Sequence, residues 1–252
     1  MYFWQAVLLV IAGVFGGMAN AMAGGASLFT FPAMMSTGLP PIVANASNGF
    51  SLLPANSLGA FIDREKLPHR GLAFYATTFA ALVGGLLGGI LLVITPPRFF
   101  SMVVPALIGL ATGLFIFGKA AQRGLAKLLD GDDHPRLRAF LIFIGGIYAG
   151  YFGAGVGVVF LAVLGATSQW ELRTTNAMKN ILGFAGNLSA NLFFVWQGVI
   201  SWPETLTMMA GATVGAFAGG YLIKVLPSQL VRNVISISGV IMTAIYVYRF
   251  WL

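Results

Sequence analysis

The sequence contains no cysteine, and only 8% of its 252 residues are charged. Without cysteine the chain forms neither disulfides nor thiolate metal sites, although this absence does not identify a compartment. Soluble domains carry roughly 25% charged residues, so the low charge excludes an ordinary soluble domain. With 58% hydrophobic residues, the composition indicates an integral membrane protein.

Histidine and carboxylate side chains are also scarce. The two histidines, His69 and His134, fall in polar loops and show no metal-ligand spacing. None of the seven Asp and Glu residues lies in the interior of a predicted span. A membrane-embedded hydrolase would need a base beside a nucleophile, and no such pair is present. We therefore expect no metal, no cofactor and no enzymatic activity.

The net charge is +7, which in a soluble protein would point to nucleic acid as a partner. Here most Lys and Arg residues lie in short loops beside apolar blocks, where positive charge marks the cytoplasmic side of a membrane. We therefore expect the lipid bilayer as the partner, no nucleic acid, and a multi-pass location in the cell membrane, as in a bacterial plasma membrane.

Apolar blocks recur along the whole chain, each near the ~20 residues that a helix needs to cross a bilayer. They do not alternate apolar and polar residues as barrel strands do, so the predicted fold class is an all-α polytopic membrane protein. About eight blocks are expected, at 3–37, 42–62, 71–94, 98–118, 139–166, 175–198, 203–224 and 230–250.

The first and fifth blocks are too long for a single span and contain clustered glycines. Gly24-Gly25-Ala26 interrupts the first block, and the segment 153–157 interrupts the fifth, so both are predicted to be broken helices or hairpins. Ala21-Met22-Ala23 resembles a signal-peptide cleavage site. Because no Lys or Arg precedes it and the apolar character continues, we expect this segment to be retained.

Shifting the chain by 131 residues aligns Asn45 with Asn176, Asn56 with Asn187 and Gly24 with Gly155. Residues 81–96 and 212–227 share seven of sixteen positions, which indicates an internal duplication. Loops 63–70 and 119–138 are rich in Lys and Arg, whereas 199–204 has none, so the two repeats are predicted to be inverted. The expected division is 1–120 as the first repeat, 121–138 as a cytoplasmic linker and 139–252 as the second repeat.

Inverted repeats with glycine-interrupted segments at matching positions are typical of secondary transporters, whose substrate lies between the repeats. Half-helices starting at Ser27 or Val158 would direct their positive ends at an anion. The predicted site uses Gly24, Gly25 and Ser27 as backbone and hydroxyl donors. The glycines Gly155 and Gly157 form a secondary set in the second repeat, where close helix packing is the alternative.

Amide side chains complete the predicted site, with Asn45, Asn48, Asn176 and Asn180 as donors and Lys179 as the counter-charge to an anion. Asn45 and Asn56, like Asn176 and Asn187, are eleven residues apart and are predicted to share one helix face. For Asn56 and Asn187, hydrogen bonding between helices is the alternative role. For Lys179 the alternative is a side chain that reaches the cytoplasmic headgroups.

Several segments resemble the TauE/SafE family of sulfite exporters. They are GGASLFTFPAMMSTGLPPIVANASN (24–48), LPANSLGA (53–60), GAGVGVVFLAVL (153–164) and TNAMKNILGFAGNLSA (175–190). The resemblance covers nearly the whole chain and implies export or exchange of small anions, chiefly sulfite, sulfonates and related organosulfur compounds. This sequence has fewer consecutive glycines at Gly24-Gly25-Ala26-Ser27 than family members usually show.

The expected function is therefore a secondary transporter, an exporter by resemblance, that carries a small anion by alternating access. An anion-selective pore and a carrier for small carboxylates are the alternatives, since glycine-broken helices also line pores. The sequence leaves open the coupling ion and whether the protein is a homodimer.

Overall fold

The computed structural model describes residues 2–251 except 63, 130–132 and 223–227. All regular secondary structure within these ranges is helical, which confirms the predicted all-α class. The first half contains α1 (Phe3–Ala23), α2 (Ser27–Ser36), α3 (Pro41–Ser51), α4 (Leu53–Ile62), the 3₁₀ turn η1 (Arg64–Lys66), α5 (Leu72–Ile94) and α6 (Pro97–Leu128). The second half contains α7 (Pro135–Tyr151), α8 (Val156–Thr167), α9 (Leu172–Trp196), α10 (Trp202–Leu222) and α11 (Ser228–Trp251).

Within the described part of the chain, four helices contain stretches long and apolar enough to cross a bilayer: residues Phe3–Ala21, Leu72–Ile94, Pro97–Gly118 and Asn233–Trp251. The 25 residues of α9 give a length of about 37 Å, sufficient for a span, but this helix carries Lys179 and four asparagines. Large apolar side chains such as Phe15, Phe79 and Phe217 are exposed on the outer surface. Such a surface suits lipid rather than water, in agreement with a polytopic membrane protein.

The first and fifth apolar blocks are broken, as the sequence predicts. The first is divided between α1 and α2 by residues 24–26, and the fifth is divided between α7 and α8 by residues 152–155. Gly24, Gly153 and Gly155 have φ values of 77°, 76° and 73°. Glycine adopts this left-handed conformation without the Cβ clash that other residues meet, which is why the chain turns at these positions.

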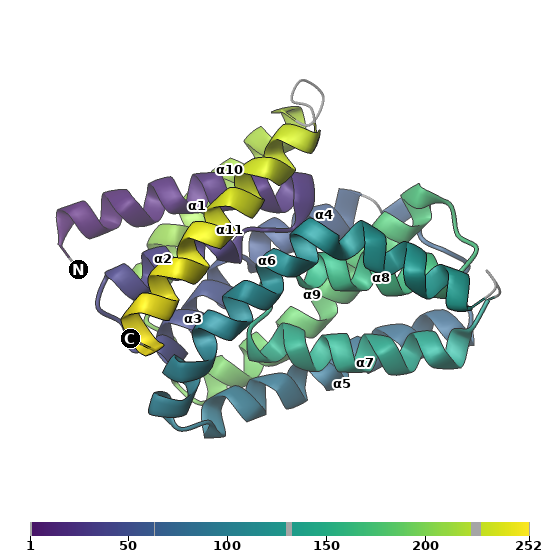
Figure 1. Ribbon diagram of the computed structural model, residues 1–252, viewed down its shortest axis with the longest axis horizontal. Helices are drawn as coiled ribbons and strands as arrows, with labels where there is room; N and C mark the ends of the chain where they lie inside the picture. Colours follow the sequence, from purple (N-terminus) through teal and green to yellow (C-terminus); the bar gives the residue numbers. More distant parts are fainter. Residues whose placement is uncertain (1, 63, 130–132, 223–227, 252) are drawn as a thin grey trace.

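Two closely packed helix pairs each join one helix of the first half to one helix of the second half. Figure 1 shows α1 and α10 along one side of the molecule, with α5 and α7 along the opposite side. A Cβ on Gly88 of α5 would collide with the carbonyl oxygen of Ile147 in α7. Likewise, a Cβ on Gly215 of α10 would collide with the carbonyl oxygen of Val14 in α1. Small residues thus allow the backbones of both pairs to approach closely, as is common between helices in membranes.

Two expected boundaries differ from the structure. The block 42–62 is divided into α3 and α4 at Leu52, because Pro54 lacks the N–H that would continue the helix to the carbonyl of Phe50. Residues 121–128, expected in the linker, extend α6, and residues 135–138 form the first turn of α7. Part of the segment predicted as a linker is therefore helical.

Candidate functional site

A cavity of about 400 Å³ lies where the two helix breaks meet. Its walls come from both halves, chiefly from α3, α4 and α9, with the ends of α1 and α7 and the beginnings of α2 and α8. Ten of the twelve residues selected from the sequence line it: Gly24, Ser27, Asn45, Asn48, Asn56, Gly157, Asn176, Lys179, Asn180 and Asn187.

The remaining two glycines lie elsewhere. A Cβ on Gly25 would stand 2.9 Å from both Ile235 and Phe115, and a Cβ on Gly155 would stand 3.4 Å from Phe115. Neither residue lines the cavity. Both glycines instead allow the two breaks to pack closely against Phe115 of α6, and Gly155 also forms the turn before α8 through its positive φ.

Each break ends one helix and begins the next. The Gly24 N–H donates to the carbonyls of Ala19 and Asn20 at 3.1 and 3.0 Å, which closes α1. The helix α2 begins at Ser27, as predicted, whereas α8 begins at Val156 rather than Val158. Gly155 already supplies the turn, so α8 starts directly after it. Neither α2 nor α8 has a side-chain cap at its N-terminus.

The two breaks lie against each other. A Cβ on Gly24 would stand 3.8 Å from the Cα of Gly157, and a Cβ on Gly157 would stand 3.7 Å from the Cδ of Lys179. The aliphatic chain of Lys179 therefore passes beside the beginning of α8. Among the described residues that line the cavity, Lys179 alone carries a charge.

Asparagines of α3 link the cavity wall to both breaks. The Asn45 Nδ2 donates to the carbonyl oxygen of Tyr151, the last residue of α7, at 3.0 Å. The Asn48 Nδ2 donates to the Ser27 Oγ at 3.3 Å. Since this contact uses the Ser27 oxygen as acceptor, the Ser27 hydroxyl hydrogen remains available as a donor near the N-terminus of α2.

Asparagines of α9 follow the cavity for much of its length. The Asn187 Nδ2 donates to the Gly183 carbonyl, and the Asn191 Nδ2 donates to the Asn187 carbonyl, both at 2.7 Å. Asn180 Nδ2 donates to the carbonyl of Gly59 at 3.3 Å. Asn176 and Asn187 lie on the predicted common face of one helix and both line the cavity.

The matching expectation for the first half is wrong, because Asn45 belongs to α3 and Asn56 to α4. Asn56 accepts a hydrogen bond from Asn20 of α1 at 2.7 Å. Sequence reasoning did not select Asn20 or Asn191. Asn191 follows Asn187 by one helical turn, and that spacing was the signal that could have identified it.

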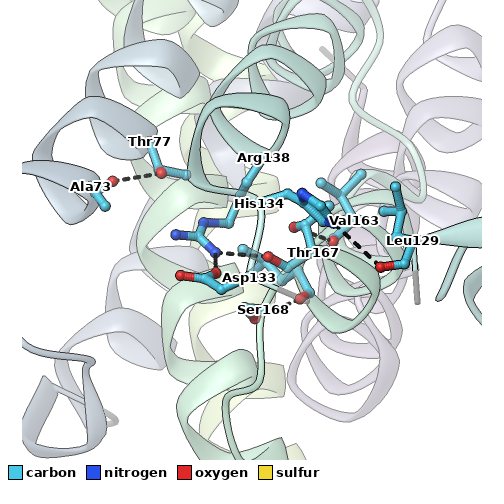
Figure 2. Close-up of polar contacts among 10 residues, drawn as sticks. Ala73, Thr77, Leu129, Asp133, His134, Arg138, Val163, Thr167 and Ser168 are labelled. Atoms are coloured by element: carbon cyan, nitrogen blue, oxygen red, sulfur yellow. Dashed lines mark hydrogen bonds and ion pairs between the residues drawn. The ribbon is translucent and has the colours of Figure 1, made fainter. Parts of the chain in front are cut away.

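A second polar cluster fixes the far end of α8 (Figure 2). Arg138 is 1% exposed, and its Nη1 donates to the Asp133 Oδ1 at 2.5 Å and to the Thr167 carbonyl at 3.0 Å. Its guanidinium lies 4.6 Å from the ring centroid of Trp170. The sequence predicts Arg138 to be one of the basic residues of the cytoplasmic linker 121–138. In the structure Arg138 is buried. It holds the Thr167 carbonyl, at the end of α8, against the first turn of α7.

Comparison with known proteins adds to this geometry. The model of the family described as sulfite exporter TauE/SafE matches residues 9–246. The chain belongs to the TauE/SafE family. It is 30% identical to a protein named probable membrane transporter protein in Haemophilus influenzae, with 96% of this chain and 94% of that one aligned.

Two further relatives of the chain carry similar names. The probable membrane transporter protein YfcA of Escherichia coli is 26% identical, over 96% of this chain and 89% of its own. The probable membrane transporter protein ORF9 of a Sinorhizobium species is 25% identical, over 92% of this chain and 88% of its own. The TauE/SafE chain described here is thus a multi-pass protein of the cell membrane, and its family is one of membrane transporters.

Proposed function

We propose that the protein is a secondary transporter that exports small anions, with sulfite, sulfonates or related organosulfur compounds as substrates. The observation that carries this proposal is the cavity between the two helix breaks, where two uncapped helix N-termini lie beside Lys179. The proposed binding residues are those selected from the sequence that line the cavity.

The electrostatics of the cavity favour an anion. A helix N-terminus carries roughly half a positive charge, and its first N–H groups lack acceptors within the helix. Two such ends, at Ser27 and Val156, enter the cavity wall. Lys179 adds a full charge, and no carboxylate is present among the described residues that line the cavity. The Ser27 hydroxyl and the asparagine amides supply neutral donors for oxygen atoms.

The size of the cavity is consistent with a small organic anion. Its volume of about 400 Å³ falls near the lower end of the range for ligand pockets, about 300–1,000 Å³. A sulfonate or sulfite ion occupies a fraction of that volume and leaves room for water. The sulfur compounds and the direction of transport come from the family, whose description is that of a sulfite exporter.

The two helix pairs that join the halves support alternating access. If the halves are inverted repeats, α1 corresponds to α7 and α5 to α10. Under this correspondence the α1–α10 pair is equivalent to the α7–α5 pair. Both pairs are present in the structure. The cavity lies at this interface between the halves, so rocking of one half against the other would expose it to each side in turn.

An anion-selective pore is the second candidate, favoured by the extended shape of the cavity. The residues of α9 that line it run from Asn176 to Phe194, which corresponds to about 27 Å along the helix axis. A cavity that follows a helix over that length, with asparagines along it, also fits a pore. A carrier for small carboxylates would use the same positive groups.

Flux through proteoliposomes separates these functions. A carrier predicts saturable uptake of labelled sulfite or sulfonate and accelerated exchange against the same anion on the opposite side. The Lys179→Met variant keeps the aliphatic stem and should lower flux about tenfold or more, because contacts to charged groups contribute about 1.5–3 kcal/mol. Lys127→Met, in the last turn of α6, is the matched control and should transport normally.

Linear flux without exchange would support the pore. Saturable transport of dicarboxylates but not of sulfur anions would overturn the proposed substrate class. Unchanged flux in Lys179→Met would show that the anion binds elsewhere.

A further inference from the structure

Two amide oxygens beside the cavity lack a hydrogen-bond donor. The side chains of Asn48 and Asn191 are each 1% exposed, and the Oδ1 atom of each is buried without a partner. Both residues line the cavity. Buried polar atoms in native folds are nearly always satisfied, so two such acceptors at one cavity point to a ligand that offers positive charge or donors.

The chemistry of its partner fixes the orientation of the Asn191 amide. Its other atom, Nδ2, contacts the Asn187 carbonyl oxygen at 2.7 Å, and a carbonyl only accepts hydrogen bonds. The nitrogen must therefore face that carbonyl, which directs the Oδ1 toward α3. A Cβ on Gly49 would stand 3.3 Å from this Oδ1. Gly49 is the chain neighbour of Asn48 in α3, which packs against α9, and both asparagines line the same cavity at this contact.

The two amide oxygens are neutral, and this property indicates which class of ligand they bind. Divalent cations such as calcium are bound in proteins largely by carboxylates, and the described lining residues include none. Neutral carbonyl-type oxygens, often at broken helices, hold sodium in secondary transporters. A carried proton would need a titratable group, and Lys179 is the ionisable side chain among the described lining residues.

The Asn191 oxygen lies away from the charged part of the proposed anion site. Asn191 follows Lys179 by twelve residues on α9, which corresponds to about 18 Å along the helix axis. A small anion held beside Lys179 does not span that distance. The Asn191 oxygen therefore requires an occupant other than that anion, and Asn48, whose Nδ2 contacts the Ser27 Oγ, would serve both places through its two amide atoms.

We propose that a sodium ion binds between α3 and α9 and that the Oδ1 atoms of Asn48 and Asn191 are two of its ligands. This ion would also serve as the coupling ion of transport. The coupling role rests on the transport function proposed above, whereas the binding of sodium does not. Gly49 belongs to the site because the absence of a side chain there leaves room beside the Asn191 oxygen.

Thermal unfolding of the purified protein in lipid nanodiscs tests the proposal without any anion substrate. The melting temperature is measured in sodium chloride, potassium chloride and choline chloride at equal concentration. Sodium should raise it by about 2–4 °C over choline when present at several times its dissociation constant. Equal melting in sodium and choline, or an equal shift with potassium, would overturn the sodium site.

Two variants localise the effect. Asn191→Leu removes the oxygen at similar volume and should abolish the sodium shift. Gly49→Ala removes no oxygen but places a methyl group 3.3 Å from the Asn191 Oδ1, and it should raise the sodium concentration needed for half of the shift about tenfold. Gly113→Ala is the matched control, because a Cβ there meets nothing within 4 Å. A full shift in both Asn191→Leu and Gly49→Ala would contradict the assignment.

Flux measurements separate this proposal from the proposed function. A sodium shift that is lost in Asn191→Leu, in a protein that moves no anion in proteoliposomes, would sustain the ion site and overturn the transporter. Saturable anion flux that is identical in sodium and choline, with no sodium shift in melting temperature, would sustain the transporter and overturn the ion site.

Discussion

The Cα of Gly157 lies 3.8 Å from the position that a Cβ on Gly24 would occupy. Gly24 closes α1, and Gly157 lies in the first turn of α8, so the two helix breaks meet at this point. The Cδ of Lys179 is 3.7 Å from the matching position on Gly157. This contact places the charged side chain of α9 beside both breaks.

Substitution of Gly24 tests whether the contact between the two helix breaks is needed for anion transport, apart from the effect of backbone strain on stability. Gly24→Ala and Gly38→Ala both place alanine at positive φ, 77° and 92°, and each should lower stability by about 1–2 kcal/mol. Only Gly24 approaches the other break, since a Cβ on Gly38 meets nothing within 4 Å. Thermal unfolding should therefore shift similarly in both variants, whereas anion flux should fall in Gly24→Ala alone. Equal flux in the two would limit Gly24 to a turn-forming role.

Filling the cavity should block transport without unfolding the protein. Gly183 lines the cavity, and a Cβ there meets nothing within 4 Å. Gly183→Leu should abolish flux while the melting temperature stays within a few degrees of the wild type, and Gly183→Ala should have a smaller effect. Full flux through Gly183→Leu would show that the substrate takes a different path.

The close contact between α5 and α7 should be sensitive to a single methyl group. A Cβ on Gly88 would collide with the Ile147 carbonyl oxygen and stand 2.8 Å from the Tyr151 nitrogen. Gly88→Ala should therefore lower the free energy of unfolding by about 1–3 kcal/mol, the usual cost of overpacking. Chemical denaturation in detergent measures this effect, with Gly113→Ala of α6 as a control that should not destabilise.

The Arg138 cluster should stabilise the end of α8. Arg138→Met removes the donor to the Thr167 carbonyl and leaves Asp133 without its partner. Because the Asp133 side chain is 54% exposed and can be solvated, the expected loss is about 2 kcal/mol rather than the larger cost of breaking a fully buried pair. Asp133→Asn should cost less than Arg138→Met in thermal unfolding, and the reverse order would contradict this assignment.

The sequence predicts the helix breaks well, because positive φ at Gly24, Gly153 and Gly155 is a local property of glycine. The α3–α4 division also has a local cause in Pro54, which the apolar content of the block conceals. In contrast, the contact between Gly24 and Gly157 and the burial of Arg138 depend on tertiary packing. Charge alone places Arg138 in a loop, and nothing local to residue 138 indicates that Trp170 and the end of α8 cover it.

The candidate site, too, can be predicted partly from local sequence and depends partly on tertiary packing. The amide pattern of α9 selects Asn176, Asn180 and Asn187, since a helix brings residues at this spacing onto one face. That pattern leaves open whether Lys179 turns toward the headgroups or toward the breaks. The position of its stem beside Gly157 depends on how α8 packs against α9.

The most direct test of the central account is anion binding to purified wild-type protein and to Lys179→Met, measured as the shift in melting temperature with sulfite, small sulfonates and small carboxylates. The account predicts that a sulfur anion raises the melting temperature of the wild type and that Lys179→Met loses most of this shift. The Lys127→Met control should retain it. An equal shift in wild type and Lys179→Met would contradict an anion site at the meeting of the two breaks.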